Sequence, residues 1–294
     1  MKIVTIKDPP AQVAILDLPA TSDAGAPPYV FLHGLGSSSI ATFPEIAAHP
    51  ALAASRSILI DLPGFGFSSA TGSATGSATG SATAHAMDGM SGARLDAWSF
   101  GVEDQAQVVV RVLAQLGISR VQLVGHSMGG SIAIALAATR PDLVVRLVVA
   151  EPNLDPGRGN LSAHIARRSE REFVERGYGM LVRGMQQQAS RGDSGAAIFL
   201  RTVLQASPVA LHRAAVSLRA ERTPTFRAQF LEAAMPRTFI AGEHSRNATA
   251  GELVPFGIGY VGIPGAGHVM MDDDPDAFAR AVARGAERAG SDRS

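Results

Sequence analysis

The chain has 294 residues, of which 46% are hydrophobic and 18% are charged, and its formal net charge is zero. This apolar content is sufficient for a sizeable buried core and excludes a chain that is disordered throughout, while neutrality argues against a general nucleic-acid-binding protein with a basic surface. The chain contains no cysteine, which excludes disulfide bonds, thiolate metal sites and a cysteine nucleophile.

The N-terminal residues Met1 to Pro10 contain no apolar stretch long enough for a signal peptide. No segment reaches the ~20 consecutive apolar residues that a membrane-spanning helix requires. Arg146 interrupts the most apolar candidate, between Val145 and Leu147. We therefore expect a soluble, cytoplasmic protein without membrane or nucleic-acid partners.

Short apolar runs rich in β-branched residues recur along the chain and are bounded by glycine, proline or aspartate. They predict strands at Val13–Leu16, Tyr29–Leu32, Ser57–Ile60, Val121–Val124, Val144–Ala150, Thr238–Ala241 and Ile258–Ile263.

Helical patterns alternate with several of these predicted strands, over roughly Val102–Leu116, Met128–Thr139 and Ala277–Ala289. In the first of them, apolar residues recur at three- and four-residue spacing and form one buried face. Strands that alternate with helices favour parallel pairing in a sheet covered on both sides. The predicted fold class is therefore α/β, a doubly wound, mostly parallel sheet of about eight strands with helices on both faces.

Two segments interrupt this alternation. Residues 69–84 repeat the sequence Ser-Ala-Thr-Gly and offer no side chain that could anchor a core, which predicts a flexible surface loop. Residues 153–227 are typical of helices without strands and contain 12 arginines against six acidic residues. This basicity would attract an anionic substrate or an acidic carrier, although a solvated helix surface is the simpler interpretation. The core domain would then comprise residues 1–152 and 228–294.

The motif Gly125-His126-Ser127-Met128-Gly129-Gly130 follows a predicted strand and opens a predicted helix. A G-x-S-x-G motif in this context places the serine on a strained turn, with its hydroxyl exposed at the carboxyl edge of the sheet. The two glycines are needed because side chains there would collide within the turn. Ser127 is therefore the predicted nucleophile.

An acyl-transfer serine also needs backbone amides that stabilise the developing negative charge on the substrate oxygen. The Met128 amide directly follows the nucleophile and lies at a helix N-terminus. A second donor should come from the loop after an earlier strand, where His33-Gly34-Leu35-Gly36 makes the Leu35 amide the candidate. We expect His33 itself to be structural.

The general base must be a histidine that reaches the serine hydroxyl. His268 follows the last predicted strand and precedes the C-terminal helix, and the order serine, acid, histidine is the one this architecture uses. His268 is therefore the predicted base, whereas His126, beside the nucleophile, is expected to point elsewhere.

Taken together, these motifs resemble those of the α/β-hydrolase superfamily. The matching stretches run in the family's order and cover nearly the whole chain: His33–Gly36, Asp61–Ser68, Gly125–Gly130 and Gly267-His268. The resemblance implies the fold and the catalytic machinery of that superfamily, and it identifies residues 153–227 as its helical cap. It does not define the substrate.

The acid of the triad departs from the family pattern. Family members often carry an aspartate after the penultimate strand, where this chain has Ser245, and a neutral serine cannot stabilise an imidazolium. Glu151 follows Val144–Ala150, and some related hydrolases place their acid after that strand. Glu243 is the alternative, two residues before the expected site. We favour Glu151 because it ends its strand and has a long side chain.

No cofactor or metal ion is predicted. Asp272, Asp273 and Asp274 are adjacent and cannot converge on one cation without further ligands, and Pro275 indicates a helix N-terminus there. The chain has no phosphate-binding loop and no histidine pair with zinc spacing.

The main hypothesis is a serine hydrolase that cleaves an ester or related acyl bond of a small molecule through an acyl-enzyme. A thioesterase or acyltransferase that takes its acyl group from an acidic carrier is one alternative, favoured by the basic cap. Carbon–carbon bond hydrolysis or lyase chemistry with the same serine and histidine is another. A third hypothesis is a binding protein without activity, in which the absence of an acid at position 245 leaves the triad incomplete. Oligomeric state is not predicted.

Overall fold

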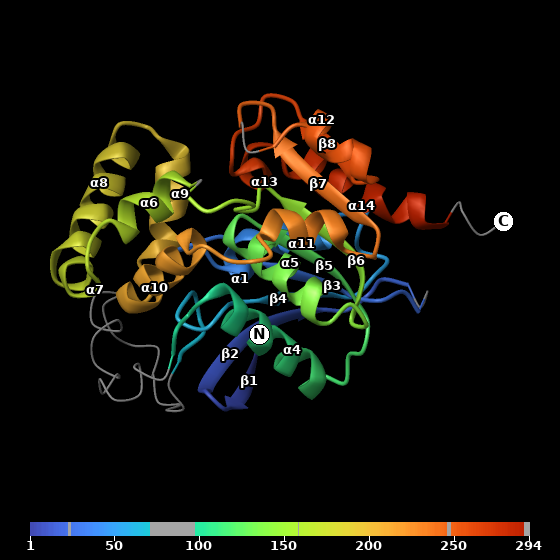
Figure 1. Ribbon diagram of the computed structural model, residues 1–294, viewed down its shortest axis with the longest axis horizontal. Helices are drawn as coiled ribbons and strands as arrows, with labels where there is room; N and C mark the ends of the chain where they lie inside the picture. Colours follow the sequence, from blue (N-terminus) through green and yellow to red (C-terminus); the bar gives the residue numbers. More distant parts are fainter. Residues whose placement is uncertain (23–24, 71–97, 158, 246–247, 291–294) are drawn as a thin grey trace.

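A computed structural model describes residues 1–22, 25–70, 98–157, 159–245 and 248–290, without the side chains of 285–290. In these ranges one sheet has the strand order β1-β2-β4-β3-β5-β6-β7-β8, in which all neighbours from β4 to β8 pair in parallel (Figure 1). The strands are β1 (Lys2–Lys7), β2 (Pro10–Leu18), β3 (Tyr29–Leu32), β4 (Ser57–Ile60), β5 (Val121–His126), β6 (Val144–Ala150), β7 (Arg237–Gly242) and β8 (Gly259–Ile263).

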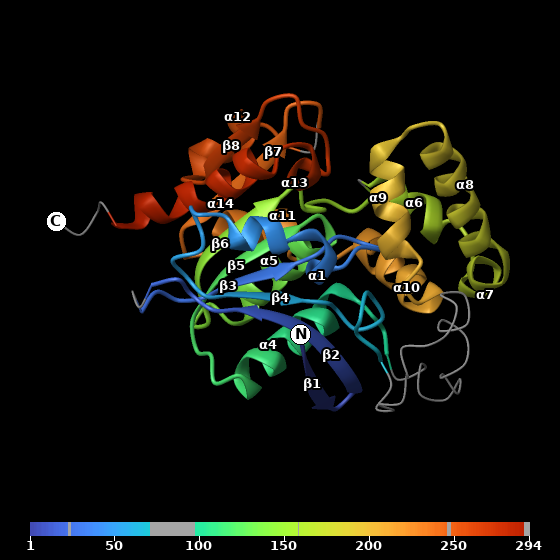
Figure 2. The same cartoon turned by 180° about the vertical axis from the view of Figure 1, so that it is seen from behind.

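The helices lie on both faces of this sheet and in a group at one end of the molecule (Figures 1 and 2). In the described residues they are α1 (Ser39–Thr42), α2 (Pro44–Ala48), α4 (Val102–Gln115), α5 (Met128–Thr139), α6 (Asn160–Ala166), α7 (Glu170–Glu172), the π-helix η1 (Phe173–Gly177), α8 (Tyr178–Ser190), α9 (Ser194–Val203), α10 (Pro208–Arg219), α11 (Phe226–Glu232), α12 (Ala250–Leu253), the 3₁₀ helix η2 (Val254–Phe256), α13 (Met270–Asp273) and α14 (Pro275–Gly290).

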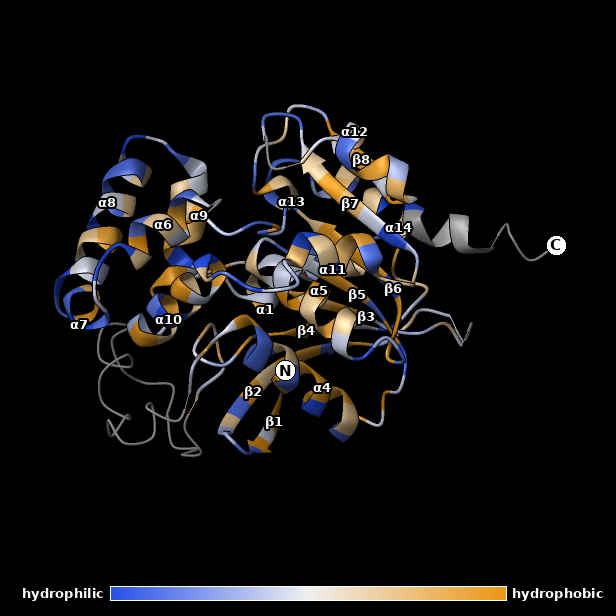
Figure 3. Ribbon diagram, viewed as in Figure 1, coloured by the Kyte–Doolittle hydropathy of each residue, from blue (hydrophilic) through white to orange (hydrophobic). Residues whose placement is uncertain are grey.

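Side chains of the strands alternate between two apolar clusters, one on each face of the sheet. Val30 and Leu32 of β3 pack with α4, α5 and α11, whereas Phe31 between them packs with α2 and α14. The expected doubly wound, mostly parallel α/β sheet with helices on both faces is therefore confirmed. The central strands are mostly apolar along their length because both faces are covered (Figure 3).

The sequence analysis missed the first strand. β1 pairs with β2 antiparallel, and β2 pairs antiparallel with β4. Only Val4 and Ile6 of β1 are buried, because this strand lies at the edge of the sheet and presents its other side chains to solvent. Such a short apolar alternation beside lysines is a weak strand signal.

Residues 153–227, the cap segment, contain helices and no strand among their described residues, as expected. Helices α6 to α10 gather at one end of the molecule in both views (Figures 1 and 2). α11, which begins at Phe226, instead packs against α5 of the core. Of the repeat segment 69–84, Ser69 pairs with Gln12 of β2, and residues 71–84 lie outside the described residues.

Among the helices of the described residues, none is by itself both long and apolar enough to cross a membrane. Helices α9 and α10 satisfy those criteria only when they are counted together, and the two are bent by 114° at their junction.

Helix α5 approaches the end of β3 closely enough to require glycine. A Cβ atom built on Gly129 would lie 2.2 Å from the carbonyl oxygen of Leu32, which is backbone and cannot rotate away. One built on Gly125 would lie 2.3 Å from the carbonyl oxygen of Gly129. The glycines of the G-x-S-x-G motif therefore permit backbone contacts between β5, α5 and β3.

We predict that Gly129→Ala lowers the free energy of unfolding by about 3 kcal/mol, because the backbone of α5 must move away from β3. Gly184→Ala, in α8, is the matched control, since a Cβ atom there meets nothing within 4 Å. It should instead stabilise the protein by about 0.5–1 kcal/mol through helix propensity. Urea unfolding measures both changes, and equal stabilities for the two variants would contradict the packing argument.

Candidate active site

Ser127 lies between β5 and α5 in a conformation that few non-glycine residues adopt. Its φ is 51° and its ψ is −118°. Such a conformation costs about 1–3 kcal/mol and persists only where surrounding contacts enforce it. Here the Ser127 amide donates to Ala150 O at 2.8 Å, and Ser127 O accepts from the Gly130 amide at 2.9 Å. The turn directs the side chain of Ser127 to a large cavity, whose wall it helps to form.

The amides of Leu35 and Met128 are the expected oxyanion donors. Leu35 follows β3 and lines the same cavity as Ser127, and Met128 is the first residue of α5. Neither amide donates a hydrogen bond to any described residue. Both amides are therefore without an acceptor among the described residues, as expected of oxyanion donors.

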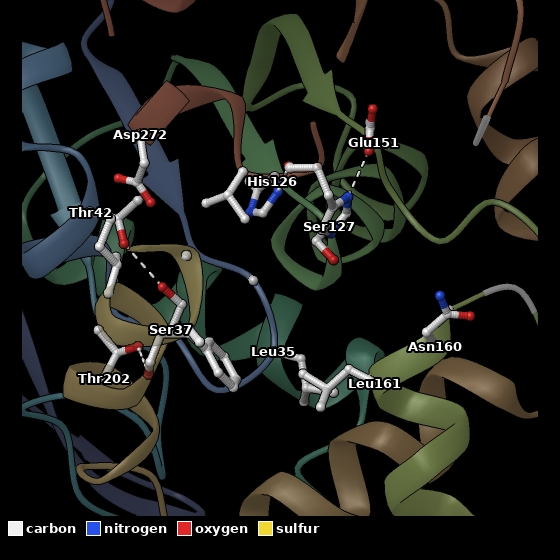
Figure 4. Close-up of a pocket in the computed structure, with 18 of the residues that line it drawn as sticks. Leu35, Ser37, Thr42, His126, Ser127, Glu151, Asn160, Leu161, Thr202 and Asp272 are labelled. Carbon is white, nitrogen blue, oxygen red and sulfur yellow. Dashed lines mark hydrogen bonds and ion pairs between the residues drawn. The ribbon is translucent and has the colours of Figure 1, made fainter. Parts of the chain in front are cut away.

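Glu151 and His268 form the closest polar contact in the cavity. The Nδ1 atom of His268 lies 2.6 Å from Oε2 of Glu151 (dashed line from Glu151 in Figure 4), and the Glu151 side chain is fully buried. Its other oxygen, Oε1, accepts from the Gly242 amide at 2.9 Å. Because a carboxylate only accepts hydrogen bonds, the proton lies on Nδ1 of His268 and Nε2 carries the lone pair. That is the tautomer a general base needs.

Glu151 is held by backbone geometry similar to that of Ser127. Its φ is 43°, and its amide donates to Ile240 O of β7 at 3.2 Å. Glu151 directly follows β6 and reaches across the end of β7 to the loop after β8. A strained, buried carboxylate bonded to a histidine is a typical feature of a functional site.

The alternative acid, Glu243, makes a different contact. Its Oε2 atom accepts from the Gly265 amide at 2.7 Å, so it stabilises the turn after β8. Ser245, at the position where the family often has aspartate, lines the cavity. Of the two carboxylates considered from the sequence, the structure brings Glu151 to His268 and Glu243 to the neighbouring turn.

Ser127 Oγ forms no hydrogen bond with any described residue, His268 included. Ser127 and His268 nevertheless line the same cavity, and the side chain of His268 is 51% exposed. In substrate-free enzymes such hydrogen bonds are often long and shorten when the substrate binds. The structure therefore brings Ser127, His268, Glu151 and Leu35 to one cavity, and Met128 directly follows Ser127 in the chain.

His126, beside the nucleophile, supports the loop that carries His268. Its Nε2 atom donates to His268 O at 2.9 Å, and the two imidazole rings lie 4.8 Å apart. Burial, together with the charge of His268, lowers the pKa of His126 from 6.5 to about 3. His126 is thus neutral at neutral pH and adds no positive charge beside the base. The sequence analysis did not foresee this contact, which links residues 142 positions apart.

His33 and Asp61 hold the Leu35 loop in place. His33 Nδ1 donates to Gly34 O at 2.8 Å, and His33 Nε2 accepts from the Leu62 amide at 3.0 Å. Burial lowers the pKa of His33. Asp61, also buried, accepts hydrogen bonds at 2.8–3.0 Å from Ser38 Oγ and from the amides of Ile40 and Phe67. The structural role expected for His33 agrees with these contacts, whereas the sequence analysis gave Asp61 no role.

The cavity measures about 1020 Å³ and lies between the core and the cap segment. Its apolar wall comes mainly from Leu35 and from cap residues (Figure 4). Those cap residues are Leu161, Met185, Phe199 and Leu218. A mostly apolar cavity with a few polar groups is typical of a site for a small organic molecule.

The excess of arginine in the cap segment is partly neutralised. Arg213 pairs with Glu170 at 2.7 Å, Arg227 with Asp155 at 2.8 Å and Arg222 with Glu103 of α4 at 3.2 Å. The cap arginines that are exposed and form no ion pair with another described residue are Arg167, Arg171, Arg176, Arg183, Arg191 and Arg201. Only Arg201 of these lines the cavity.

The three adjacent aspartates do not all lie at a helix N-terminus, because the short helix α13 precedes α14. Asp272 and Asp273 belong to α13, and only Asp274 caps α14, where its Oδ1 atom accepts from the Ala277 amide at 2.9 Å. Asp273 Oδ2 accepts from the Gly267 amide at 2.8 Å. No three histidine or acidic side chains of the described residues gather as a metal site.

Comparisons with known proteins identify the family of this chain. The sequence profile of the Alpha/beta hydrolase family matches residues 29–281. The 2-hydroxy-6-oxononadienedioate/2-hydroxy-6-oxononatrienedioate hydrolase of Paraburkholderia phymatum is 35% identical over 128 residues, which cover 43% of this chain and 36% of that protein. The sn-1-specific diacylglycerol lipase ABHD11 of Danio rerio is 41% identical over 64 residues, which cover 21% of this chain and 20% of the lipase. The alignments thus span about a third of these relatives' length or less.

Solved structures share the fold over almost the whole chain. A thermophilic esterase from Thermogutta terrifontis has a TM-score of 0.72 at 18% identity and covers 98% of this chain and 99% of its own. The enol-lactonase from Burkholderia xenovorans LB400 also has a TM-score of 0.72 at 18% identity, with coverages of 97% and 100%. At this level of identity the likeness concerns the fold alone.

The lowered pKa of His126 predicts acid sensitivity. The folded state keeps His126 neutral, whereas the unfolded state binds a proton below pH 6.5, so this contribution to stability is present above pH 6.5 and is lost as the pH falls toward 3. Between pH 7.5 and pH 5.0 the wild type should lose about 2 kcal/mol more of its unfolding free energy than His126→Asn.

Urea unfolding at the two pH values measures this difference. His244→Asn, which removes an exposed histidine, is the control and should retain the wild-type pH dependence. Equal pH dependence in wild type and His126→Asn would show that His126 is not held neutral by the fold.

Proposed function

The chain belongs to the alpha/beta hydrolase family, and on that premise we propose that it is a serine hydrolase that cleaves an ester or related acyl bond of a small molecule. The observation that carries the proposal is the contact of His268 Nδ1 with the buried carboxylate of Glu151, in the cavity that Ser127 lines in a strained conformation. Strained turns and buried acid–histidine pairs are costly, and they persist at functional sites because the chemistry requires them.

In the proposed acylation step, Ser127 Oγ attacks the carbonyl carbon of the substrate while His268 Nε2 takes the hydroxyl proton. The carbonyl oxygen becomes negative and accepts hydrogen bonds from the Leu35 and Met128 amides. The bond to the leaving group then breaks, and the protonated His268 gives its proton to the departing oxygen. Glu151 stabilises the imidazolium throughout this step and keeps the ring oriented.

In the proposed deacylation step, water attacks the acyl carbon and gives a proton to His268 Nε2. The bond between the acyl carbon and Ser127 Oγ breaks, Ser127 recovers the proton, and the carboxylic acid leaves. The proposed reaction needs only these side chains, two backbone amides and water. Its first step requires Oγ and Nε2 to come within hydrogen-bond distance when the substrate is bound.

Labelling with a fluorophosphonate probe tests the nucleophile. We predict that the wild type is labelled, that Ser127→Ala is not, and that this variant loses turnover of short-chain esters by about 10³-fold or more. Circular dichroism and thermal unfolding serve as controls for folding. A folded wild type that resists labelling would overturn the proposed nucleophile and favour a binding protein.

Paired substitutions distinguish the two carboxylates. Glu151→Gln should lower kcat by about 10³- to 10⁴-fold, because an amide nitrogen opposite Nδ1 would favour the wrong imidazole tautomer. Glu243→Gln is the matched control and should retain kcat close to the wild-type value, since its amide oxygen still accepts from Gly265 N. The opposite result, a large loss only in Glu243→Gln, would make Glu243 the acid.

Assays of the wild type with further substrates distinguish ester hydrolysis from the competing reactions. Assays should include a 2-hydroxy-6-oxodienoate, since one relative is named as a hydrolase of that class, and a carrier-bound thioester. Faster turnover of the first substrate would favour carbon–carbon hydrolysis. Salt-sensitive turnover restricted to the second would favour an acidic carrier that docks on the cap arginines.

A further inference from the structure

Three polar residues of the core contribute to the wall of the cavity. They supply the carboxylate of Asp272 in α13 and the hydroxyls of Thr42 in α1 and Ser37 in the loop after β3 (Figure 4). Ser37 Oγ and Thr42 Oγ1 are 3.0 Å apart and form a hydrogen bond. Two segments that are distant in sequence, residues 37–42 and α13, thus bring hydrogen-bonding groups to the cavity.

The carboxylate of Asp272 has no hydrogen-bond or ion-pair partner among the described residues. Its neighbours Asp273 and Asp274 accept backbone hydrogen bonds from Gly267 and Ala277, whereas the Asp272 side chain forms no hydrogen bond or ion pair with any described residue. Asp272 is exposed at the cavity wall, where partial desolvation and the nearby charge of Asp273 raise the pKa of its carboxyl group. An accessible carboxylate at this place can form a charge-assisted hydrogen bond with a donor on a ligand.

The other charged side chains of the cavity have different positions or tasks. Glu151 is bonded to His268, and Asp193 caps α9, where it accepts from the Ala196 amide at 2.9 Å. Arg201 lies in the last turn of α9, in the cap segment. Asp272 is therefore the carboxylate of the described cavity wall that is free to contact a ligand.

The position of Asp272 relative to the proposed base indicates which part of a substrate it would contact. The leaving oxygen must receive its proton from His268, so the leaving group lies beside that residue. Asp272 follows His268 by four residues and lines the same cavity. The cap residues Leu161 and Met185 give the cavity an apolar lining that suits an acyl chain.

We propose that Asp272, together with Thr42 and Ser37, forms a leaving-group subsite that selects esters whose alcohol carries a hydroxyl or ammonium donor and rejects alcohols that carry a carboxylate. The inference rests on the proposed hydrolase function and adds the class of alcohol to it. A donor on the alcohol would form a charge-assisted hydrogen bond with Asp272, while a carboxylate there would meet a like charge.

Three butanoate esters of similar size test the subsite: the 2-(dimethylamino)ethyl ester, which is an ammonium at neutral pH, the neutral 3-methylbutyl ester and the anionic carboxymethyl ester. In the wild type, kcat/KM for the ammonium ester should exceed that for the neutral ester by about tenfold, with the anionic ester slowest. Asp272→Asn should reduce the first ratio to near one and raise the relative rate of the anionic ester.

Asp276→Asn is the matched control. It removes the same charge from α14, where Asp276 contacts His49 and Arg280 outside the cavity, and it should keep the wild-type ratios. Thr42→Val, which preserves shape and removes one hydroxyl, should lower the preference for a hydroxylated ester, glycerol monobutanoate, over the 3-methylbutyl ester. This variant also keeps the test decisive if Asp272→Asn folds poorly.

The outcomes separate the two proposals. If Ser127 is labelled but the wild type hydrolyses all three esters at equal rates, the subsite proposal is wrong and the hydrolase proposal is retained. The same conclusion follows if Asp272→Asn leaves the kcat/KM ratios between the esters unchanged. A folded wild type with neither labelling nor turnover would overturn the hydrolase and the subsite with it.

Discussion

The fully buried carboxylate of Glu151 joins three parts of the chain that are distant in sequence. It directly follows β6, accepts a hydrogen bond from the end of β7 at Gly242, and contacts His268 in the loop after β8. A buried charge is stable only when its oxygens are bonded, so the ends of these strands must keep their relative positions. The strand order β6-β7-β8 supplies that arrangement, and the orientation of His268 depends on it.

A second buried carboxylate has a similar role on the other side of the cavity. Asp61, after β4, accepts three hydrogen bonds, two of them from Ser38 and Ile40, which follow the Leu35 loop. The amide of Leu35 is therefore held in place from outside the cavity, through contacts that do not touch a substrate. The two carboxylates fix loops after five strands at one edge of the sheet, which is where parallel sheets commonly carry their sites.

Between these fixed loops, backbone atoms approach each other closely around Ser127. Gly129 and Gly125 have no room for a side chain, and Ser127 itself adopts a positive φ. The strain is offset by the packing of α5, whose first ten residues are all buried. By contrast, the cavity wall that the cap segment contributes consists of side chains such as Met185 and Phe199. This division is consistent with a rigid set of proposed reacting groups beside a wall of side chains that could vary with the substrate.

The sequence by itself was sufficient to predict the α/β fold class and the family, and to propose Ser127 as nucleophile and His268 as base. Those features depend on local signals, namely apolar periodicity and glycines that flank a turn, which short stretches of sequence contain in full. The sequence left Glu151 and Glu243 as alternatives, because both follow strands and short stretches of sequence do not indicate which strand ends are neighbours in the sheet. Only the tertiary structure decided that Glu151 contacts His268 across 117 positions, that Asp61 holds the Leu35 loop, and that Asp272 rather than Asp273 faces the cavity without a partner. The physical reason is that these contacts result from the pairing order of the sheet and from the space between packed elements, which are properties of the whole chain.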